Sequence, residues 1–440
     1  MPHTFPNNLA EKIRQHKARV GVIGLGYVGL PLAVEFASKG YPTVGIDVDE
    51  KRVRAIHNKC SYITDISSDQ IARLVSQGKF RATTKFSVLK NLDVVMICVP
   101  TPLRKSKEPD ISFILSAAEP LAKYLHRCQV IILESTTYPG TTEEVILPML
   151  EKTGLRVGID FFLGFSPERI DPGNKTYTTA SIPKVVSGVT PACRRLIQLF
   201  YGQVIQHVVP VSSTKVAEMV KLLENTFRSV NIGLVNELAM MCHRFGVDVW
   251  EVIEAAKTKP FGYMAFYPGP GLGGHCIPID PLYLSWKAKA YGFEPRFIEL
   301  SSQVNAEMPE HVVGRVAQAL NGKGKTLKGS RILILGVAYK RDVTDVRESP
   351  ALEIIQHLEK NGARVGYYDP YVPTLKVGSK VYRSVSMTRS GVVSGADCVV
   401  IVTDHQSVDY RPVVKQARLI LDTRNALRNI HPRPRKLVRL

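Results

Sequence analysis

Hydrophobic residues in the first third of the chain fall into short apolar runs separated by amphipathic segments. RVGVIG (19–24) has the length of a buried strand, PLAVEFASKG after it has helical periodicity, and TVGIDVD predicts a second strand that ends at Asp47. Further strands are predicted at 92–100 and 129–137, with a helix between them that starts near Asp110. Alternating strands and helices predict a parallel, doubly wound sheet.

The pattern changes to one long helix between Ser212 and about Arg244. Its apolar residues recur every three or four positions and form one stripe, at Val216, Val220, Leu223, Phe227, Val230, Leu234, Leu238 and Met241. A helix of this length usually bridges domains or subunits. A shorter helix, DVWEVIEAAKT, follows, and then a loop rich in Gly and Pro.

The alternating pattern returns after the Gly- and Lys-containing linker at 323–330. RILILGVAYK begins a second Rossmann-like unit, and PALEIIQHLEKNG predicts a helix closed by Gly362. Its first turn, GVAYKRD, lacks the GxGxxG pattern, so no second dinucleotide is expected there.

We therefore predict an α/β protein with two Rossmann-like doubly wound domains joined by a central helical domain. The predicted parts are a lead-in of loop or short helix at 1–18, a first Rossmann domain at 19–205, a central helical domain at 206–310, a C-terminal domain at 325–428 and a basic tail at 429–440.

Composition narrows the class of protein. Hydrophobic residues make up 45% of the 440 positions and charged residues 22%, which predicts a globular protein of several domains. The longest apolar runs are far below the ~18 residues needed to span a bilayer, and the N-terminus has no apolar signal core. We expect a cytoplasmic protein without membrane segments. The cysteines lack CxxC or zinc-type spacing, so they are expected to be reduced and metal-free.

Lys and Arg exceed Asp and Glu by 58 to 39, which gives a net charge of +19. This charge attracts phosphates of nucleic acids, acidic lipids or small molecules. The basic residues are dispersed except in the C-terminal HPRPRKLVRL, and no RNP or zinc-finger pattern accompanies them. Specific nucleic-acid binding is therefore the disfavoured alternative, which a steep salt dependence of nucleic-acid affinity would reveal.

The turn GLGYVG (24–29) has the strand, turn, helix, strand context that a dinucleotide site needs. Gly24 permits the tight bend, Gly26 lets backbone N–H groups approach a pyrophosphate, and Gly29 allows close helix packing. Asp47 can accept hydrogen bonds from the ribose hydroxyls, which favours NAD over NADP, with Arg52 as a secondary contact. The alternative is a glycine-rich turn with no ligand.

Lys221 and Asn225 lie one turn apart on the long helix, with Glu218 on the same row. A solvated polar face is the ordinary explanation for such residues. The functional alternative is that a cation and an amide donor converge on a developing oxyanion.

Cys276 lies in PGPGLGGHCIPIDP (268–281), four residues before Asp280. It could be an ordinary buried thiol. A thiolate that captures an aldehyde as a thiohemiacetal, however, creates an oxyanion that can expel hydride and leave a thioester for water to hydrolyse. Cysteine beside a carboxylate and NAD therefore suggests a four-electron oxidation of an alcohol to an acid. His275 is not taken as the base, because neighbours on an extended loop point apart.

Collinear motifs over about residues 19–428 resemble the UDP-glucose/GDP-mannose dehydrogenase family. They are GLGYVG (24–29), CVPTP (98–102), ESTTYPG (134–140), SPERIDPGN (166–174), KLLEN (221–225), GGHCIPID (273–280) and YKRDVTDVRESP (339–350). The resemblance implies an NAD domain, a central domain that forms a homodimer through the long helix, and a C-terminal domain that binds the nucleotide of a UDP-sugar.

The resemblance also implies site residues. Cys276 would be the nucleophile, Lys221 and Asn225 would stabilise oxyanions, Asp280 and Thr136 would hold the water used in proton transfer, and Glu168 would support thioester hydrolysis. The implied NAD contacts are Gly24, Gly26, Tyr27, Val28, Gly29, Asp47, Arg52, Val99, Pro100, Thr101, Ser135, Thr136 and Arg347. The implied substrate contacts are Glu168, Arg169, Lys221, Asn225, Tyr267, Gly269, Gly271, Gly273, Lys340 and Arg424.

The substrate implied is UDP-N-acetylglucosamine, oxidised for surface polysaccharide synthesis. UDP-glucose enzymes typically have a Lys and an acidic residue where this chain has Ile279 and Pro172. UDP-N-acetylmannosamine and then UDP-glucose are the nearest rival substrates. A 3-hydroxyacid dehydrogenase is a further alternative, which would transfer one hydride and need no cysteine.

Overall fold

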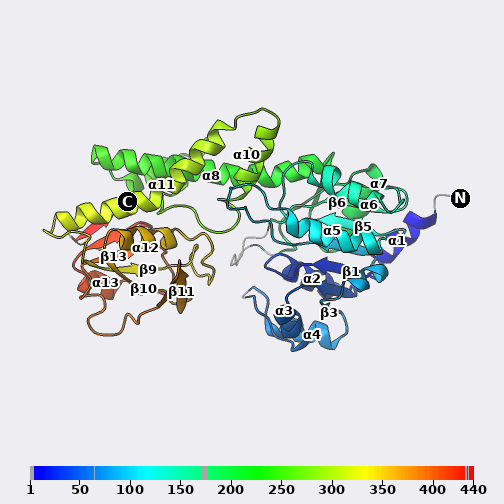
Figure 1. Ribbon diagram of the computed structural model, residues 1–440, viewed down its shortest axis with the longest axis horizontal. Coiled ribbons are helices and arrows are strands. Elements are labelled where there is room, and N and C mark those ends of the chain that lie inside the picture. The colour runs from blue at the N-terminus through cyan, green and yellow to red at the C-terminus, as the bar shows by residue number, and fades with distance from the viewer. Residues whose placement is uncertain (1–3, 64, 170–176, 178, 432–433, 435) are drawn as a thin grey trace. The chain divides into compact units, whose positions relative to one another are not determined.

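A computed structural model of the chain describes residues 4–63, 65–169, 177, 179–431, 434 and 436–440. It divides into two compact units. One unit comprises Met1–Glu224 and Leu282–Gly292, and the other comprises Asn225–Pro281 and Phe293–Leu440. Figure 1 follows the chain through both units from the N-terminus to the C-terminus. The mixed α/β class with parallel sheets, predicted from the alternating pattern, is confirmed.

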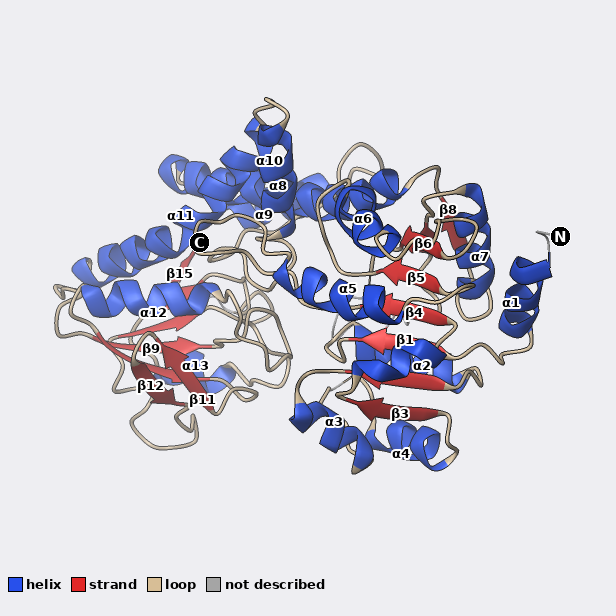
Figure 2. Cartoon of the chain, turned by 45° about the vertical axis from the view of Figure 1, so that its right-hand side comes forward, coloured by secondary structure: helices blue, strands red, loops and turns tan. Residues whose placement is uncertain are grey.

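The first unit is built on a six-stranded parallel sheet with the order β3-β2-β1-β4-β5-β6 (Figure 2). Its strands are β1 (Val20–Ile23), β2 (Thr43–Ile46), β3 (Phe80–Thr83), β4 (Val94–Ile97), β5 (Val130–Leu133) and β6 (Phe162–Phe165). The predicted strands correspond to β1, β2, β4 and β5. Since the order turns back at β1, the carboxyl ends of β1 and β4 are neighbours, which is where open α/β sheets bind ligands.

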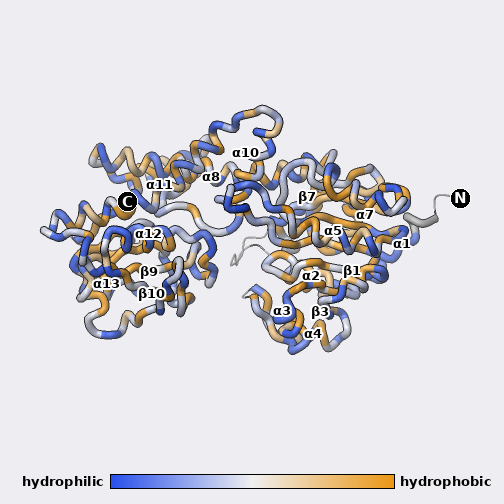
Figure 3. The backbone as a smooth tube through the Cα atoms, viewed as in Figure 1, coloured by the Kyte–Doolittle hydropathy of each residue, from blue (hydrophilic) through white to orange (hydrophobic). Residues whose placement is uncertain are grey.

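Helices cover both faces of this sheet. Successive side chains of a strand point to opposite faces, and both sets are apolar here, so both faces need to be covered. Val130 and Ile132 of β5 belong to one buried cluster, whereas Ile131 and Leu133 belong to another. The helices and short helical segments are α1 (Thr4–Arg14), α2 (Gly29–Ser38), α3 (Glu50–His57), α4 (Ser68–Ser76), η1 (Phe86–Asn91), α5 (Ser112–Tyr124), η2 (Thr141–Ile146), α6 (Leu147–Glu151) and α7 (Pro191–Tyr201). Hydrophobic colour follows the strands and the helices against them (Figure 3).

The lead-in, predicted as loop or short helix, forms the helix α1. Its Leu9 and Ile13 are buried in the core of the unit, which was not predicted. Two further strands, β7 (Lys184–Val186) and β8 (Val208–Pro210), pair in parallel with each other and form a sheet separate from the main one.

The long predicted helix is α8 (Thr214–Phe245). Part of its predicted apolar stripe is exposed: Leu223 is 62% exposed and Leu234 is 61% exposed, whereas Val220, Val230 and Leu238 are half-buried. The buried face carries apolar side chains such as Leu222 and Val235 and also polar ones, namely Glu218, Asn225, Ser229 and Asn236. A solvated polar face, the ordinary explanation, is therefore wrong for Glu218 and Asn225, and each buried polar group needs a hydrogen-bond partner.

The second unit holds a five-stranded parallel sheet with the order β10-β9-β13-β14-β15. Its strands are β9 (Arg331–Leu335), β10 (Arg364–Tyr368), β13 (Cys398–Ile401), β14 (Ile420–Asp422) and β15 (Leu437–Arg439), with a separate hairpin of β11 (Thr374–Val377) and β12 (Lys380–Arg383). Its helices are α9 (Val249–Lys257), α11 (Arg296–Asn321), α12 (Pro350–Lys360) and α13 (Arg411–Gln416). The helix α10 (Asp280–Ala290) has its first two residues in the second unit and the rest in the first unit.

The end of the predicted basic tail is part of this sheet. β15 pairs with β14 in parallel, from Leu437 opposite Ile420 to Arg439 opposite Asp422. Arg439 also forms an ion pair with Asp248 at 2.5 Å. The Lys and Arg content of the segment concealed the short apolar strand within it.

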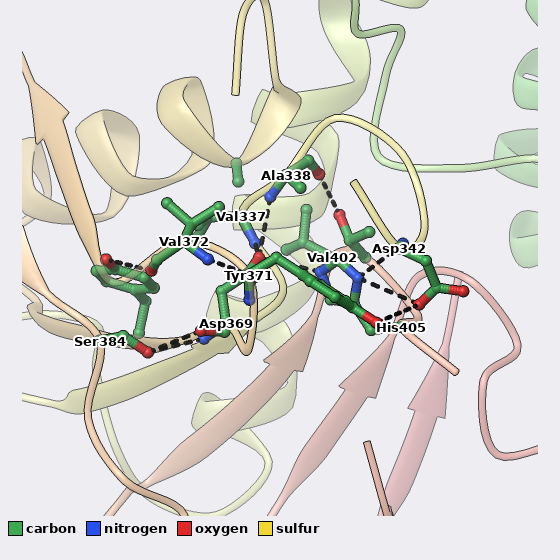
Figure 4. Close-up of polar contacts among 12 residues, drawn as sticks. Val337, Ala338, Asp342, Asp369, Tyr371, Val372, Ser384, Val402 and His405 are labelled. Atoms are coloured by element: carbon green, nitrogen blue, oxygen red, sulfur yellow. Dashed lines mark hydrogen bonds and ion pairs between the residues drawn. The ribbon is translucent and has the colours of Figure 1, made fainter. Parts of the chain in front are cut away.

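Asp369 organises the turn that follows β9, and Figure 4 shows its contacts. Its oxygens accept hydrogen bonds at 2.7–3.1 Å from the backbone N–H groups of Val337, Ala338, Tyr371 and Val372. The buried His405 contributes a further contact, with Nε2 3.0 Å from the carboxylate. His405 Nδ1 accepts from the backbone N–H of Asp342 at 2.9 Å, so the neutral ring donates through Nε2. The carboxylate that follows β10 is thus bonded to the chain's own donors.

We predict that Asp369→Asn destabilises the second unit by about 1–3 kcal/mol, because an amide nitrogen would face N–H donors in a buried site. Burial raises the pKa of Asp369, but the bonds from His405 and Val337 outweigh it and lower this pKa overall. The resulting stability is present above the unfolded pKa of about 3.9 and is lost as pH falls toward the lowered folded pKa.

Denaturant unfolding between pH 3 and 7 measures this effect. Wild-type protein should lose stability below about pH 4 more steeply than Asp369→Asn. The exposed Asp409, paired with Arg411 at 2.9 Å, gives the control Asp409→Asn, expected to change stability by about 0.5 kcal/mol or less. Equal effects at the two positions would contradict the assignment.

Candidate active site

The glycines of GLGYVG occupy three different environments. Gly24 has φ +91°, in the left-handed region, and a side chain there would collide with the backbone of Cys98. A Cβ on Gly29 would collide with the carbonyl oxygen of Gly24, whereas one on Gly26 would meet nothing within 4 Å. Gly24 and Gly29 are therefore needed for the fold of the turn, and Gly26 leaves open space beside it.

Asp47 closes the turn from the end of β2. Its Oδ2 accepts from Leu25 N–H at 2.7 Å and from Arg52 at 3.1 Å, and its Oδ1 accepts from Asp49 N–H at 2.9 Å. Arg52 is thus held beside Asp47 as a partner of the carboxylate. Tyr27 and Val28, also predicted to contact the cofactor, are half-buried between β1 and α2 and pack against the core.

The other residues predicted to contact the cofactor follow the neighbouring strands. Val99, Pro100 and Thr101 lie in the loop after β4, and Ser135 and Thr136 lie in the loop after β5. Val99 N–H donates to Ser135 Oγ at 2.9 Å, which ties the two strand ends together. The structure therefore brings these residues to the carboxyl edge of the sheet that also carries the glycine turn.

Glu218 fastens α8 to the loop after β5. Its carboxylate accepts from Gly140 N–H at 2.6 Å, from Thr142 N–H at 2.9 Å and from Thr142 Oγ1 at 2.7 Å. Burial raises the pKa of Glu218 to about 7 although these donors oppose the shift. Thr136 lies in the loop that this contact anchors.

Lys221, one turn further along α8, contacts the segment after β6. Its Nζ donates to the backbone oxygen of Glu168 at 2.5 Å. The adjacent Arg169 forms an ion pair with Glu224 and donates to Pro183 O at 2.7 Å. Residues 170–174 of the SPERIDPGN motif, including Pro172, lie outside the described residues.

The side chain of Glu168 points into a buried group that sequence reasoning missed. Lys184 Nζ lies 3.0 Å from Glu168 Oε2 and 2.6 Å from Glu134 Oε2, and Tyr201 donates to the other oxygen of Glu134. Lys184, which precedes two valines, belongs to no recognisable local pattern. The one weak signal was Glu134, an acidic residue of the ESTTYPG motif that follows a buried strand.

In the second unit, Asn225, Cys276 and Asp280 lie together. Asn225 Nδ2 donates to Asp280 Oδ2 at 2.6 Å, and both side chains are buried. Asp280 N–H donates to the carbonyl oxygen of Cys276 at 2.8 Å, so residues 276–280 form one helical turn that leads into α10. The turn places the half-buried Cys276 one helical turn before Asp280, whose carboxylate is bonded to the Asn225 amide.

The glycine-rich loop before Cys276 packs tightly against other parts of the second unit. A Cβ on Gly269 would collide with the guanidinium of Arg424, and one on Gly273 would lie 2.8 Å from Tyr339. Gly271 has φ +127°, and Gly269 N–H donates to Asn236 Oδ1 at 2.9 Å. The loop therefore needs glycine for close packing against the chain itself, whatever ligand it binds.

The remaining predicted site residues are also in the second unit. Arg424 Nε donates to Val402 O at 3.0 Å, and Tyr267 donates to Glu254 at 2.8 Å. Arg347 pairs with Asp345 at 2.6 Å, and its Nη2 lies 3.3 Å from His275 Nδ1. Burial lowers the pKa of Arg424. Lys340, half-buried, precedes Arg341, which is paired with Asp404.

Comparison with known proteins gives consistent matches along the chain. Residues 18–205 match the NAD binding domain, 215–307 the central domain and 333–429 the UDP binding domain of the UDP-glucose/GDP-mannose dehydrogenase family. In the described ranges, no helix has the length and apolarity to cross a membrane, and no group of three or more His, Cys, Asp or Glu residues could hold a metal ion.

Similar proteins carry related names. The chain is 36% identical to a UDP-N-acetyl-D-mannosamine dehydrogenase from Pyrococcus horikoshii, over 93% of this chain and 96% of the relative. It is 39% identical to a UDP-N-acetyl-D-glucosamine 6-dehydrogenase from Pseudomonas aeruginosa, over 80% of this chain and 83% of the relative. A solved structure of the Pyrococcus horikoshii UDP-D-ManNAc dehydrogenase has a TM-score of 0.86, with coverage of 96% and 98% and 35% identity. The resemblance and the NAD cofactor predicted from the sequence are confirmed.

Two substitutions separate NAD binding from folding. Gly26→Ala should leave the Tm unchanged, because the protein has open space there, but should weaken NAD binding about 10-fold or more because the methyl group occupies the approach to the pyrophosphate. Gly29→Ala should lower the Tm, since its Cβ collides with Gly24. Calorimetric NAD titration and thermal unfolding measure both. Unchanged NAD affinity in Gly26→Ala would contradict the placement of the pyrophosphate.

Proposed function

The chain belongs to the UDP-glucose/GDP-mannose dehydrogenase family, and from this premise we propose that it oxidises the C6 hydroxymethyl group of UDP-N-acetyl-D-glucosamine to a carboxylate. It is an NAD-dependent nucleotide-sugar dehydrogenase. The observation that carries the proposal is the turn that holds Cys276 beside the Asn225–Asp280 pair. A thiol in this setting makes a four-electron oxidation possible.

The first oxidation needs a base and a stabilised alkoxide. We assign water held by Asp280 and Thr136 to the removal of the C6 hydroxyl proton. Lys221 and Asn225 supply a cation and an amide donor from adjacent turns of one helix, and both stabilise negative charge on the oxygen at C6. NAD held at the glycine turn by Gly24, Gly26 and Asp47 would supply the hydride acceptor for the oxidation at C6, and a second NAD would supply it for the second oxidation.

The second oxidation depends on the cysteine. The Cys276 thiolate attacks the aldehyde carbon and forms a thiohemiacetal, whose oxyanion is again stabilised by Lys221 and Asn225. Loss of hydride from this intermediate leaves a thioester on Cys276. Glu168 then takes a proton from the water that attacks the thioester carbonyl, the C–S bond breaks, and the uronate leaves.

The C-terminal unit supplies the contacts proposed for the nucleotide. Arg424 and Lys340 provide positive charge for the diphosphate, and the loop from Tyr267 to Gly273 provides backbone for the sugar. Arg169 contributes beside Glu168, and Arg347 is proposed to reach NAD. These assignments rest on the family motifs and on the close approach of the Arg424 guanidinium to Gly269.

The N-acetylglucosamine substrate is supported by Ile279 in place of the lysine typical of UDP-glucose enzymes and by the 39% identical relative from Pseudomonas aeruginosa. UDP-N-acetylmannosamine is the second candidate, favoured by the Pyrococcus horikoshii relative. We place the reaction in the cytoplasm, where UDP-sugars and NAD are available, with the uronate used in surface polysaccharide synthesis.

Purified enzyme with NAD and each of UDP-N-acetylglucosamine, UDP-N-acetylmannosamine and UDP-glucose tests the function. The first should give the highest kcat/KM and two NADH per sugar. Cys276→Ser should lower turnover roughly 100-fold or more and abolish the second NADH, whereas Cys60→Ser, at an exposed thiol, should behave as wild type. One NADH per sugar in wild type would refute the thioester route, and faster turnover of UDP-glucose would refute the choice of sugar.

We also propose that the protein is a homodimer through α8. The stripe of Val216, Met219, Leu223, Phe227, Leu234 and Met241 is exposed along most of the helix, and a long apolar surface of this kind marks an interaction site. Its length and regular spacing suit packing against the same helix of a second copy.

Leu223→Glu combined with Leu234→Glu should convert the dimer to monomers, because burial of two carboxylates in an apolar interface is unfavourable. Light scattering after size-exclusion chromatography gives the mass. Val381→Glu makes the same chemical change at an exposed valine of β12 and should leave the dimer intact. A monomeric wild type, or a double variant of unchanged mass, would contradict this interface.

A further inference from the structure

The buried group behind Glu168 contains two carboxylates around one ammonium. Lys184 is 5% exposed, Glu134 is 1% exposed and Glu168 is 8% exposed. Lys184 Nζ lies 2.6 Å from a Glu134 oxygen and 3.0 Å from a Glu168 oxygen, so it bridges the two acids. Three ionisable groups removed from water are unfavourable unless they are paired.

The charge of Lys184 is strongly maintained. Burial lowers the pKa of Lys184, but attraction to Glu134 and Glu168 outweighs burial and raises the pKa well above its ordinary value. For Glu134 burial is the largest effect, and together with Glu168 it raises the pKa although Lys184 and the Tyr201 hydroxyl oppose it. The two carboxylates therefore compete for one cation.

Two other basic residues within the described ranges also lie close to Glu168, and the side chain of each bonds to a partner other than the Glu168 carboxylate. Lys221 donates to the backbone oxygen of Glu168, and the Arg169 guanidinium pairs with Glu224. The Arg169 N–H donates to Glu168 Oε1 at 2.7 Å, which fixes one carboxylate oxygen but adds no net charge. The buried Cys98 thiol, close enough for its pKa to be raised by burial and by Glu134, stays protonated. Lys184, from β7, places its positive charge directly on the carboxylate.

We propose that Lys184 is a positioning residue for thioester hydrolysis, which holds the side chain of Glu168 in the orientation that accepts the proton of the attacking water. The inference rests on the proposed function. In the step concerned, the water oxygen bonds to the thioester carbon, one water proton passes to Glu168, and the C–S bond breaks with its electrons on Cys276 sulfur. Glu134 takes part of the charge of Lys184 and so moderates the basicity of Glu168.

A purely structural ion pair would stabilise the fold without affecting one chemical step. The inference instead predicts a selective effect on hydrolysis, because both hydride transfers precede it. Slow hydrolysis should appear as a burst of two NADH per subunit followed by a slow steady rate. The burst amplitude and the pH dependence of the steady rate are readouts that a structural role would not change.

The experiment uses full-length wild type, Lys184→Met, Lys184→Arg and Glu134→Gln with NAD and UDP-N-acetylglucosamine in a stopped-flow instrument from pH 6 to 9. Lys184→Met should give the two-NADH burst, a steady rate at pH 7 reduced about 10-fold or more, and a rate profile moved to higher pH by roughly 1–3 units, since Glu168 without its cation keeps a proton. Lys184→Arg should restore most of the steady rate.

Glu134→Gln should shift the steady-rate profile in the opposite direction, to lower pH, because Lys184 then pairs with Glu168 alone. This arm decides the question if Lys184→Met does not fold. The control is Tyr201→Phe, which removes a hydroxyl that bonds to Glu134 and not to Glu168. Its steady-rate profile should lie at nearly the same pH as that of wild type.

The outcomes distinguish failure of the proposed function from failure of the role proposed for Lys184. A wild type that forms no NADH, or one NADH per sugar, overturns the proposed function and this inference with it. A wild type that forms two NADH, with Lys184→Met and Glu134→Gln profiles that coincide with wild type or shift in the same direction, overturns the role of Lys184 alone. Opposite shifts, with a burst in Lys184→Met, support it.

Discussion

Hydrogen bonds made by the buried polar face of α8 determine where the proposed catalytic groups lie. Glu218 bonds to the loop after β5, Lys221 to the segment after β6, and Asn225 to Asp280. Because an unpaired polar group in a buried site is costly, each contact restricts both the helix and the loop that it meets. One helix thus fixes the donors proposed for the oxyanion and the carboxylate beside the nucleophile.

The buried face of α8 combines these polar contacts with apolar side chains such as Leu222 and Val235, whereas Leu223 and Leu234 remain exposed on the other side. In the proposed dimer, a second copy of the chain offers the exposed residues a surface of the same kind. The contacts proposed for the chemistry and for the dimer therefore lie on opposite faces of one helix. The ammonium of Lys184 adds a further buried polar contact, to Glu168.

Local sequence patterns were sufficient for the fold class. Apolar runs and turn glycines predicted β1, β2, β4, β5 and β9, and α8 begins and ends within two residues of its prediction. β15 was missed because its apolar residues lie among Lys and Arg. The sequence pattern favoured a solvated face for Glu218 and Asn225, whereas both side chains are buried. Their partners at Gly140 and Asp280 are distant in sequence, so the pattern could not reveal them. Lys184, Glu134 and Glu168 come from three separate segments and Tyr201 from a fourth, so no local pattern reveals their contacts.

The claim at the centre of this structure is that Cys276 carries the sugar covalently between oxidation and hydrolysis. Acid quenching during turnover, followed by digestion and mass analysis, locates such an adduct directly. We predict a UDP-N-acetylglucosaminuronyl group on the peptide that contains Cys276, released by hydroxylamine as expected of a thioester. Formation of two NADH per sugar with no adduct on Cys276, or with the adduct on another cysteine, would contradict the claim.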